Sequence, residues 1–581
     1  MFKLLKRLGK YWWLVALMIV TISINVVADC ILPTYLGSII GLLQNSGQIE
    51  IGEIAITAVG MLMVALVSGL SAILTCRMAS RVSAHIVAET RYALYKKIGE
   101  FSNNEMNQFS VSSLVTRTTN DLTFVGDTFS LFFRFILYGP LVAIIAISLL
   151  FSSGSQNLSL AYIVLGALIL MIVFIAVVVM LTIKKYRAIQ SKLDKVTLVT
   201  RENLEGLRVV RAYGAEEYQE EKFAKYNAEL RHTEIFANRG IGLLQPGVQL
   251  IVGALNVTIF WICSKVVPEG SLPFPVMSVV LQYASLILMG FIMITLVIVQ
   301  MPRAMVCAKR INTVLETQPL VVGKETSPEQ LEVGTIEFKD VSFIYPGAEK
   351  PVLENISFRA EKGTTIAFIG ATGSGKTTLI NLLPRFFDVT NGQVLVDGVD
   401  VRDYNLNDLN HKFGYVPQKG YLFHDTLVKN ITVGCPNASA PEIQRALDIS
   451  QSTEFVSKLP DGLEYEISQG GKNVSGGQRQ RLCIARAIIM RPEIFIFDDS
   501  FSALDYRTDK VLRAEIKKQC QGTTNVIVAQ RVGTIMDADQ IIVLDQGKMV
   551  GKGTHKELLK NCQVYKEIAL SQLSKEELEN A

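Results

Sequence analysis

The first half of the chain is built from long apolar runs, whereas the second half alternates short apolar runs with polar residues. An α-helix needs about 20 mostly apolar residues to cross the hydrocarbon core of a bilayer. The runs that reach this length cover residues 12–43, 54–79, 128–151, 158–183, 243–266 and 274–300. The pattern therefore predicts six membrane-spanning helices in the first half of the chain.

The segments between these runs alternate in length and charge. Residues 80–127 and 184–242 are long, rich in Lys and Arg, and keep a helical spacing of apolar residues. The segments 44–51, 152–157 and 265–273 are short and carry little positive charge. Segments rich in Lys and Arg stay on the cytoplasmic side of a membrane. We therefore expect a multi-pass membrane protein, with both termini in the cytoplasm and with inner segments that continue as helices.

Among the polar side chains in the apolar runs, Asp29, Asn256, Gln282 and Arg134 are the ones that we expect at membrane depth. Ionisable groups at membrane depth are rare and usually functional. Asp29 follows Trp12 by 17 residues, which places it about 25 Å along the helix, near the outer leaflet. It could line the transport pathway or an outer gate, reach water, or pair within a dimer. Arg134 could extend to the inner interface.

The composition fits two domains of different character. A chain of 581 residues is too long for a single core. Its mean hydropathy of +0.32 is high for a soluble enzyme. The eight Cys and five His show no metal-ligand spacing, so neither a disulfide framework nor a zinc site is expected. The net charge of +4 does not indicate a nucleic-acid partner.

The strongest motif lies in the second half, where a buried-strand pattern (365–369) is followed by GATGSGKTT (370–378) and a helical pattern. A chance glycine loop is the alternative, but the strand–loop–helix context disfavours it. Such glycines let backbone N–H groups surround phosphate oxygens at a helix N-terminus. Lys376 would reach the β- and γ-phosphates, and Thr377 would bind Mg²⁺. The residues predicted to bind ATP here are Gly370, Thr372, Gly373, Ser374, Gly375, Lys376, Thr377 and Thr378.

A second apolar strand pattern, 494–497, ends in Asp498, and an acid in that place can hold Mg²⁺ directly or through water. Residues 317–335 contain Pro and Gly among polar residues, which is typical of a linker. We therefore predict an α-helical six-transmembrane domain (1–316), a linker (317–335) and an α/β P-loop nucleotide-binding domain (336–581). ATP and Mg²⁺ are the expected cofactors.

Between the two motifs lies NVSGGQRQR (473–481), which resembles the LSGGQ signature of the ABC ATPases. The order of phosphate loop, signature and acidic strand end is specific to that family. The resemblance implies that Tyr345 stacks on adenine, and that Gln418 contacts Mg²⁺ and transmits nucleotide binding to the membrane domain. It also implies that SALD (502–505) forms the D-loop, and that the second half is an ABC nucleotide-binding domain.

The membrane half resembles the exporter branch of the ABC transporters in LVTRTTND (114–121), ENLEGLRVV (202–210) and AKRI (308–311). Importers of this family usually carry their membrane domains on separate chains, so the fusion favours export. In this family two ATP molecules lie between two nucleotide-binding domains, each held by one domain's phosphate loop and the other's signature. The resemblance therefore implies a dimer. The signature residues that would contact the partner's ATP are Ser475, Gly476, Gly477 and Gln478.

Two positions depart from the family pattern. The family's general base is a Glu, where this chain has Asp499, and its switch histidine is replaced by Gln530. Asp is one methylene shorter than Glu, and a misplacement of about 1 Å can cost about 100-fold in rate. Gln can donate an N–H to the γ-phosphate but cannot become positively charged. Both changes together resemble the degenerate half of heterodimeric bacterial multidrug exporters, whose own ATP site hydrolyses weakly.

The sequence thus predicts an ATPase subunit that exports a hydrophobic or amphipathic substrate, drug-like or lipid, with a homologous second half-transporter as its partner. Two other hypotheses stay open. One is a homodimeric exporter with slow ATPase activity. The other is an ATP-gated regulatory subunit that binds nucleotide without pumping. The residues nearest to the hydrolysis chemistry in each case are Gln418, Asp499 and Gln530, and those predicted to hold Mg²⁺ are Thr377, Gln418 and Asp498.

Overall fold

The computed structural model describes residues 2–44, 51–152, 158–266, 274–330 and 332–573. The chain divides into two compact units by its internal contacts. One comprises Met1–Gly99 and Val111–Thr317, and the other comprises Glu100–Ser110 and Gln318–Ala581. Most of the three short segments predicted between the apolar runs (45–50, 153–157 and 267–273) lies outside the described residues.

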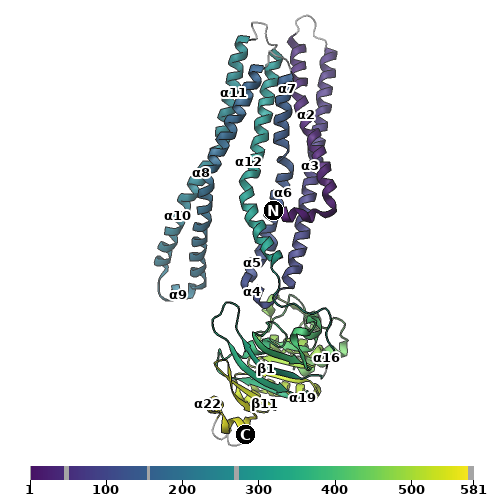
Figure 1. Ribbon diagram of the computed structural model, residues 1–581, viewed down its shortest axis with the longest axis vertical. Coiled ribbons are helices and arrows are strands. Elements are labelled where there is room, and N and C mark those ends of the chain that lie inside the picture. The colour runs from purple at the N-terminus through teal and green to yellow at the C-terminus, as the bar shows by residue number, and fades with distance from the viewer. Residues whose placement is uncertain (1, 45–50, 153–157, 267–273, 331, 574–581) are drawn as a thin grey trace. The chain divides into compact units, whose positions relative to one another are not determined.

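Within its described residues, the first unit consists of helices and their connections (Figure 1). Its elements are α1 (Phe2–Leu5), η1 (Lys6–Tyr11), α2 (Trp12–Gln44), α3 (Ile51–Gly99), α5 (Val111–Thr116), η2 (Arg117–Asp121), α6 (Leu122–Phe135), α7 (Tyr138–Ser152), α8 (Leu158–Glu205), α9 (Leu207–Ala212), α10 (Glu216–Gly242), α11 (Leu244–Val266) and α12 (Phe274–Glu316).

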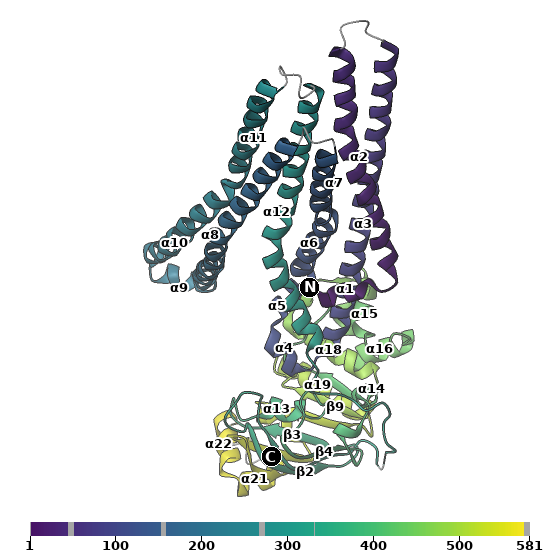
Figure 2. The ribbon, with the colours of Figure 1, turned by 45° about the horizontal axis from the view of Figure 1, so that its top comes forward.

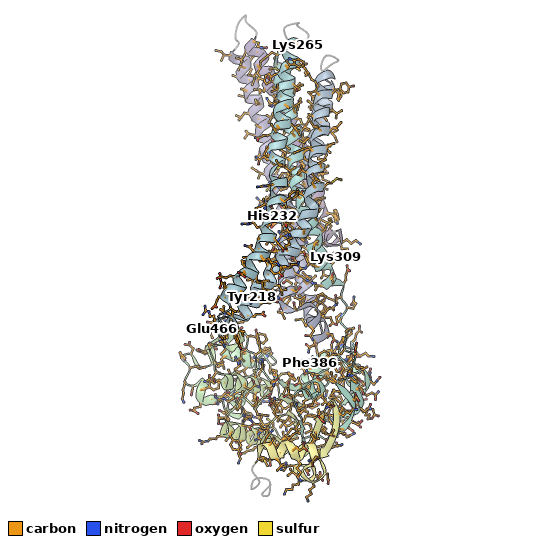
Figure 3. The ribbon with its side chains drawn as sticks, turned by 90° about the vertical axis from the view of Figure 1, so that its left-hand side faces the viewer. Tyr218, His232, Lys265, Lys309, Phe386 and Glu466 are labelled. Carbon is orange, nitrogen blue, oxygen red and sulfur yellow. The ribbon has the colours of Figure 1, made fainter. Side chains whose placement is uncertain are left out.

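Six helical stretches of this unit are long and apolar enough to span a membrane, and each overlaps one of the predicted runs. The six-helix prediction is therefore confirmed. The inner segments also continue as helices: α3 extends to Gly99 and α8 to Glu205. Helices α8 and α10 lie side by side and are joined by α9 (Figure 2). Tyr218 and His232 mark the course of α10, and Lys265 marks the far end of α11 (Figure 3).

The third predicted run, 128–151, departs from a single continuous helix. Its helix is interrupted between Phe135 and Tyr138, where α6 ends and α7 begins. Pro140 explains the interruption, because a proline has no N–H and its ring clashes with the carbonyl group four residues earlier, here that of Ile136. The backbone close to this break is tightly packed, since a Cβ on Gly139 would lie 2.7 Å from the carbonyl oxygen of Gly290 in α12.

The second unit contains three sheets. A four-stranded antiparallel sheet has the order β2-β1-β4-β5, a mainly parallel sheet has the order β12-β11-β3-β10-β9-β6, and β7 pairs with β8. The strands are β1 (Ile336–Phe343), β2 (Leu353–Ala360), β3 (Thr365–Ile369), β4 (Asn391–Val396), β5 (Val399–Asp400), β6 (Phe413–Val416), β7 (Asp425–Thr426), β8 (Glu466–Ile467), β9 (Ile494–Asp498), β10 (Thr524–Val528), β11 (Gln540–Asp545) and β12 (Lys548–Gly553).

Helices and short helical turns complete the second unit. They are α4 (Asn103–Phe109), α13 (Lys376–Asn381), η4 (Val401–Asp403), α14 (Leu406–His411), α15 (Leu427–Ile431), α16 (Ala440–Ile449), α17 (Thr453–Val456), η5 (Gly462–Glu464), η6 (Gln469–Gly471), α18 (Gly476–Ile489), α19 (Tyr506–Gln519), α20 (Val532–Ile535), α21 (His555–Asn561) and α22 (Gln563–Gln572). Two apolar clusters form its core, and the buried strands β3, β9 and β10 contribute residues to both.

The central strands of the mainly parallel sheet determine where the predicted site residues of this unit lie. β3, β10 and β9 are neighbours and run parallel, so their carboxyl ends meet at one edge of the sheet. Side chains that follow these three strands are therefore brought together although they come from distant parts of the sequence. The phosphate-loop motif follows β3, Asp498 and Asp499 lie at the end of β9, and Gln530 follows β10.

Candidate ATP site

The glycine-rich loop joins β3 to α13, as the motif requires (Figure 2). Gly370 is required by a close approach, because a Cβ at this position would overlap the carbonyl oxygen of Leu544. Gly375 precedes the first residue of α13 and has a φ of 96°, a left-handed conformation that favours glycine. The loop therefore has the backbone shape in which N–H groups can face a phosphate.

Lys376 points back over this loop. Its Nζ donates hydrogen bonds to the carbonyl oxygens of Gly370 and Ala371, both at 2.8 Å. The side chain is largely buried, and this burial lowers the pKa of its ammonium group, while Asp499 and Asp498 oppose the shift. The amine is thus held within reach of the loop by neutral oxygens, which a phosphate could replace.

Thr377 and Asp498 meet at the edge of the sheet. The Thr377 hydroxyl donates to Asp498 Oδ1 at 3.0 Å. Burial raises the pKa of Asp498, and the Thr377 hydrogen bond opposes the shift. Hydroxyl and carboxylate oxygens suit Mg²⁺, which usually binds proteins through one or two side chains together with water and substrate phosphates. The described residues contain no group of three or more His, Cys, Asp or Glu that could hold a metal by themselves. The donor set therefore fits a magnesium ion that arrives with a nucleotide.

Asp499, which is predicted to take part in hydrolysis, is contacted by two amide side chains. Its backbone is left-handed, with a φ of 48°, and its N–H donates to the carbonyl oxygen of Val528 at 2.9 Å. Its Oδ2 accepts from Gln530 Nε2 at 3.0 Å and from Gln418 Nε2 at 3.3 Å. Burial raises the pKa of this carboxyl group, and the hydrogen bond from Gln418 opposes the shift. One carboxylate oxygen thus holds both neighbouring amides.

The loop that carries Gln418 is bracketed by a buried glutamine of α18. Gln480 Nε2 donates to the carbonyl oxygen of Pro417 at 3.0 Å, and its Oε1 accepts from the Gly420 N–H at 3.1 Å. The two contacts lie on either side of Gln418. The sequence pattern assigns no role to Gln480, because nothing in the residues around it shows which loop its side chain reaches.

The segment that carries Gln530 is bracketed in the same way by the last residue of α22. Gln572 Nε2 donates to the carbonyl oxygen of Gln530, and its Oε1 accepts from the Val532 N–H, both at 2.8 Å. Helix α22 is anchored by Tyr565, which is fully buried and lies 2.6 Å from His555 Nδ1. Sequence reasoning missed Gln572. The only available signal was the helical spacing of Tyr565, Ala569 and Gln572.

Most of the predicted site residues line one hollow of about 300 Å³. This cavity brings together residues as far apart in the sequence as Thr372 and Gln530, with Gln418, Asp498 and Asp499 between them in the chain. The phosphate-loop residues that line it are Thr372, Gly373, Gly375, Lys376, Thr377 and Thr378. The predicted residues Gly370, Ser374 and Tyr345 do not line it.

Tyr345 nevertheless lies next to the loop. Its hydroxyl is 2.9 Å from the Thr378 hydroxyl, and its ring contacts the rings of Phe343 and Phe387 edge-on. The side chain is half-buried. Its predicted contact with adenine therefore remains a prediction.

The signature residues lie elsewhere in the unit, at the start of the 14-residue helix α18. Ser475 Oγ accepts from the Gln478 N–H at 3.2 Å, and Gln478 Oε1 accepts from the Ser475 N–H at 2.9 Å. This capping box satisfies the first turn of the helix. Ser475 and Gly476 are exposed, and none of the four signature residues lines the hollow.

The bracket formed by Gln572 can be tested directly. In the full-length protein, Gln572→Ala is expected to speed hydrogen exchange of the Val532 amide roughly 5- to 30-fold, because two hydrogen bonds of about 1 kcal/mol each are lost. Gln572→Glu keeps the acceptor for Val532 but loses the donor for Gln530, so its effect should be smaller.

The matched control is Gln563→Ala on the same helix, where the glutamine donates to Glu567. This change should leave the exchange rate at Val532 unaltered. Unchanged protection in Gln572→Ala would mean that α22 does not hold the Gln530 segment.

Two family models match the chain. The ABC transporter transmembrane region matches residues 15–291, and the ABC transporter model matches residues 353–502. The first covers most of the helical unit, and the second spans the phosphate loop, the signature and Asp498.

Similar proteins match along nearly the whole chain. An uncharacterised ABC transporter ATP-binding protein of Mycobacterium tuberculosis is 36% identical, over 98% of this chain and 97% of its own length. An ATP-dependent lipid A-core flippase of Vibrio vulnificus is 30% identical, over 95% of this chain and 94% of its own length.

The fold is also shared with a solved structure. A bacterial Atm1-family ABC exporter with ATP bound superposes with a TM-score of 0.80 at 22% identity, and the match covers 98% of each chain. Taken with the six spanning helices and the P-loop sheet, these matches show that the chain belongs to the ABC transporter family, as a multi-pass membrane protein whose cytoplasmic ATPase domain couples ATP hydrolysis to transport.

Proposed function

We propose that this chain is one subunit of a heterodimeric exporter that moves a hydrophobic or amphipathic substrate across the plasma membrane. Its own ATP site binds nucleotide but hydrolyses it weakly. Its signature, Ser475 to Gln478, completes the competent site on the partner. The observation that carries this proposal is the contact between Gln530 and Asp499, at 3.0 Å, in place of the family's His and Glu.

The geometry explains why this site would be slow. A general base must take a proton from the attacking water, and its carboxylate must lie within hydrogen-bond reach of that water. Asp499 is shorter than Glu, and its Oδ2 already accepts from Gln530 and Gln418. Oδ2 is thus occupied by two amide donors, and the shorter side chain places the whole carboxylate farther from the attacking water than a Glu would. Gln530 is neutral, so it cannot supply the charge of a protonated His.

Nucleotide binding is retained in this proposal. Lys376 would exchange its two loop carbonyl contacts for phosphate oxygens, and the loop N–H groups would face the same anion. Thr377, Asp498 and Gln418 would hold Mg²⁺, which neutralises charge on the β- and γ-phosphates when bound. Tyr345 would contact adenine. Slow hydrolysis would keep ATP in this site for longer than in the partner's.

Exposure of the signature supports the dimer. Ser475 and Gly476 present the N–H end of a long helix to solvent, away from this chain's own hollow. In a dimer they would face the phosphates bound by the partner. ATP binding would then draw the two ATPase domains together, and the Gln418 loop would pass the closure to the membrane helices. The affinity of ATP for the closed state supplies the energy for the switch.

The substrate class is supported by composition and by one relative. The spanning helices are mostly aliphatic with scattered aromatic residues, which suits apolar molecules. The similar Vibrio vulnificus protein is named as a flippase of lipid A-core, an amphipathic lipid. A lipid or a drug-like amphipath is therefore the substrate class we propose.

The proposal is tested by purifying the chain alone and together with a homologous half-transporter encoded by a neighbouring gene. The chain alone should hydrolyse ATP at least about tenfold more slowly than the pair, since its own site lacks an effective base. Asp499→Glu and Gln530→His, singly or together, should change the rate of the pair little, because turnover occurs at the partner's site.

Two results would contradict this assignment. If the chain alone hydrolyses ATP as fast as the pair, it is a homodimeric exporter with an unusual base. If the pair hydrolyses ATP but moves no substrate in proteoliposomes, the regulatory-subunit hypothesis replaces export.

A further inference from the structure

A carboxylate within the first spanning helix is held by side chains of two other helices. Asp29 of α2 accepts from the Ser68 hydroxyl of α3 at its Oδ1, at 2.6 Å, and from the Tyr138 hydroxyl of α7 at its Oδ2, at 2.7 Å. Ser68 is oriented in turn by Asn25, whose Nδ2 donates to the Ser68 hydroxyl at 3.0 Å. Both oxygens of the carboxylate thus have a fixed position.

The backbone at this point is fixed as well. Tyr283 of α12 donates its hydroxyl to the carbonyl oxygen of Cys30 at 2.9 Å, and both residues are almost completely buried. Four helices, α2, α3, α7 and α12, therefore meet at Asp29 and Cys30. Preorganisation of this kind is what a binding group needs, because little motion is left to be frozen when a ligand arrives.

The charge of this group is not balanced by the protein. Within the described part of the chain, Asp29 forms no ion pair with a Lys, Arg or His, and its contacts are with hydroxyl groups. A carboxylate offers about four acceptor sites, of which two are used here. A charge at membrane depth is costly unless it meets an opposite charge or water. Asp29 is only half-buried, so it remains open to such a partner.

We propose that Asp29 binds the cationic group of an amphipathic substrate while the apolar side chains around it receive the apolar body. The inference rests on the proposed export function and narrows its substrate class to amphipathic cations. On the same helix, the exposed Val27 and the partly exposed Ile31 both line an apolar hollow that could receive this body, whereas Val26 and Cys30 are fully buried. A neutral molecule of the same shape would gain only the apolar part of the interaction.

Three probes of similar shape distinguish the contribution of charge to binding from the contribution of apolar contact. They are tetraphenylphosphonium (a cation), tetraphenylborate (an anion) and triphenylphosphine oxide (neutral). The full-length chain is assembled with its partner in lipid nanodiscs, and the binding of each probe is measured without nucleotide. The wild-type protein should prefer tetraphenylphosphonium over tetraphenylborate after correction for partitioning into empty nanodiscs. This comparison needs no variant.

Asp29→Asn then removes the charge and keeps the shape. It should weaken tetraphenylphosphonium binding about 10- to 100-fold, as expected for a contact between charged groups, and leave triphenylphosphine oxide binding nearly unchanged. Ser68→Ala and Tyr138→Phe keep the charge, so they should weaken cation binding less. The control Glu53→Gln removes an exposed charge at the start of α3 and should change neither affinity.

The outcomes separate this inference from the function on which it rests. If Asp29→Asn binds the cation like the wild type, or if the wild type prefers the anion, Asp29 is not a cation site. If Asp29→Asn weakens binding of the neutral probe as much as binding of the cation, Asp29 only stabilises the packing of the helices. ATP-driven transport of the neutral probe in those cases would leave the export function intact, whereas absence of transport for all three probes would count against export itself.

Discussion

Gly476→Asp is expected to lower the ATPase rate of the assembled transporter by at least about 100-fold. The added carboxylate would face the terminal phosphate of the partner's ATP, and like charges brought together cost several kcal/mol, of which about 1.4 kcal/mol already corresponds to tenfold in rate. The measurement is steady-state ATP hydrolysis by the purified pair, together with the melting temperature of each variant.

The structure makes this change a selective one. Gly476 is the first residue of α18, it is exposed, and a Cβ placed on it meets no atom within 4 Å. Its φ lies outside the left-handed region, so a side chain adds no backbone strain. The capping box of Ser475 and Gln478 is untouched. The melting temperature should therefore be unaltered. A loss of ATPase activity would then indicate that the new carboxylate acts on a group outside this chain.

Ala440→Asp provides a matched control. Ala440 is the first residue of α16, it is exposed, and it follows a capping box formed by Ser439. The same charge is thus added at the same helical position, so neither activity nor melting should change. Lys376→Ala gives the converse comparison, with a much smaller loss than Gly476→Asp if this chain's own site is the slow one. Equal losses would instead support two equivalent sites in a homodimer.

The second large effect concerns stability. Lys412→Met is expected to lower the free energy of opening of the ATP-binding unit by about 3–5 kcal/mol, the usual cost of leaving one member of a buried ion pair alone. Lys412 Nζ donates to Asp397 Oδ2 and, at 2.9 Å, to Glu493 Oε2. Asp397 is fully buried, and its Oδ1 also accepts from the Thr335 N–H at 3.1 Å. Removal of the ammonium group would leave a buried carboxylate without its charge partner.

Hydrogen exchange of the slowest amides in β4 and β6 measures the free energy of opening of the ATP-binding unit in the full-length protein. Lys458→Met is the control, because its ion pair with Glu454 is exposed on both sides and should contribute little to stability. The double change Lys412→Met and Asp397→Asn should recover part of the loss, since the unpaired charge is gone. Equal effects of Lys412→Met and Lys458→Met would show that the buried pair does not stabilise this unit.

The sequence was sufficient to predict a feature wherever all the residues that specify it lie in one continuous segment. The length and apolarity of each spanning run predicted its helix, because a bilayer imposes both on any segment that crosses it. Glycines at fixed spacing before Lys376 predicted the phosphate loop, because that spacing between a strand and a helix is the pattern of a phosphate-binding loop. The substitutions Asp499 and Gln530 were visible by comparison with the family pattern alone. Pro140 is a local signal for the interruption, but the continuous apolar run around it led to the prediction of one unbroken helix.

The tertiary structure decided what joins segments distant in the sequence. Gln480 and Gln572 bracket the loops of Gln418 and Gln530, and Asp29 receives hydroxyl groups from α3 and α7. The spacing of apolar residues along a helix or strand shows only which face of that element is apolar. It does not show which polar side chains of two different elements will contact each other. Those meetings depend on how the elements pack, so the sequence by itself determined the family, the membrane spans and the nucleotide motifs, while packing alone determined how these residues are held.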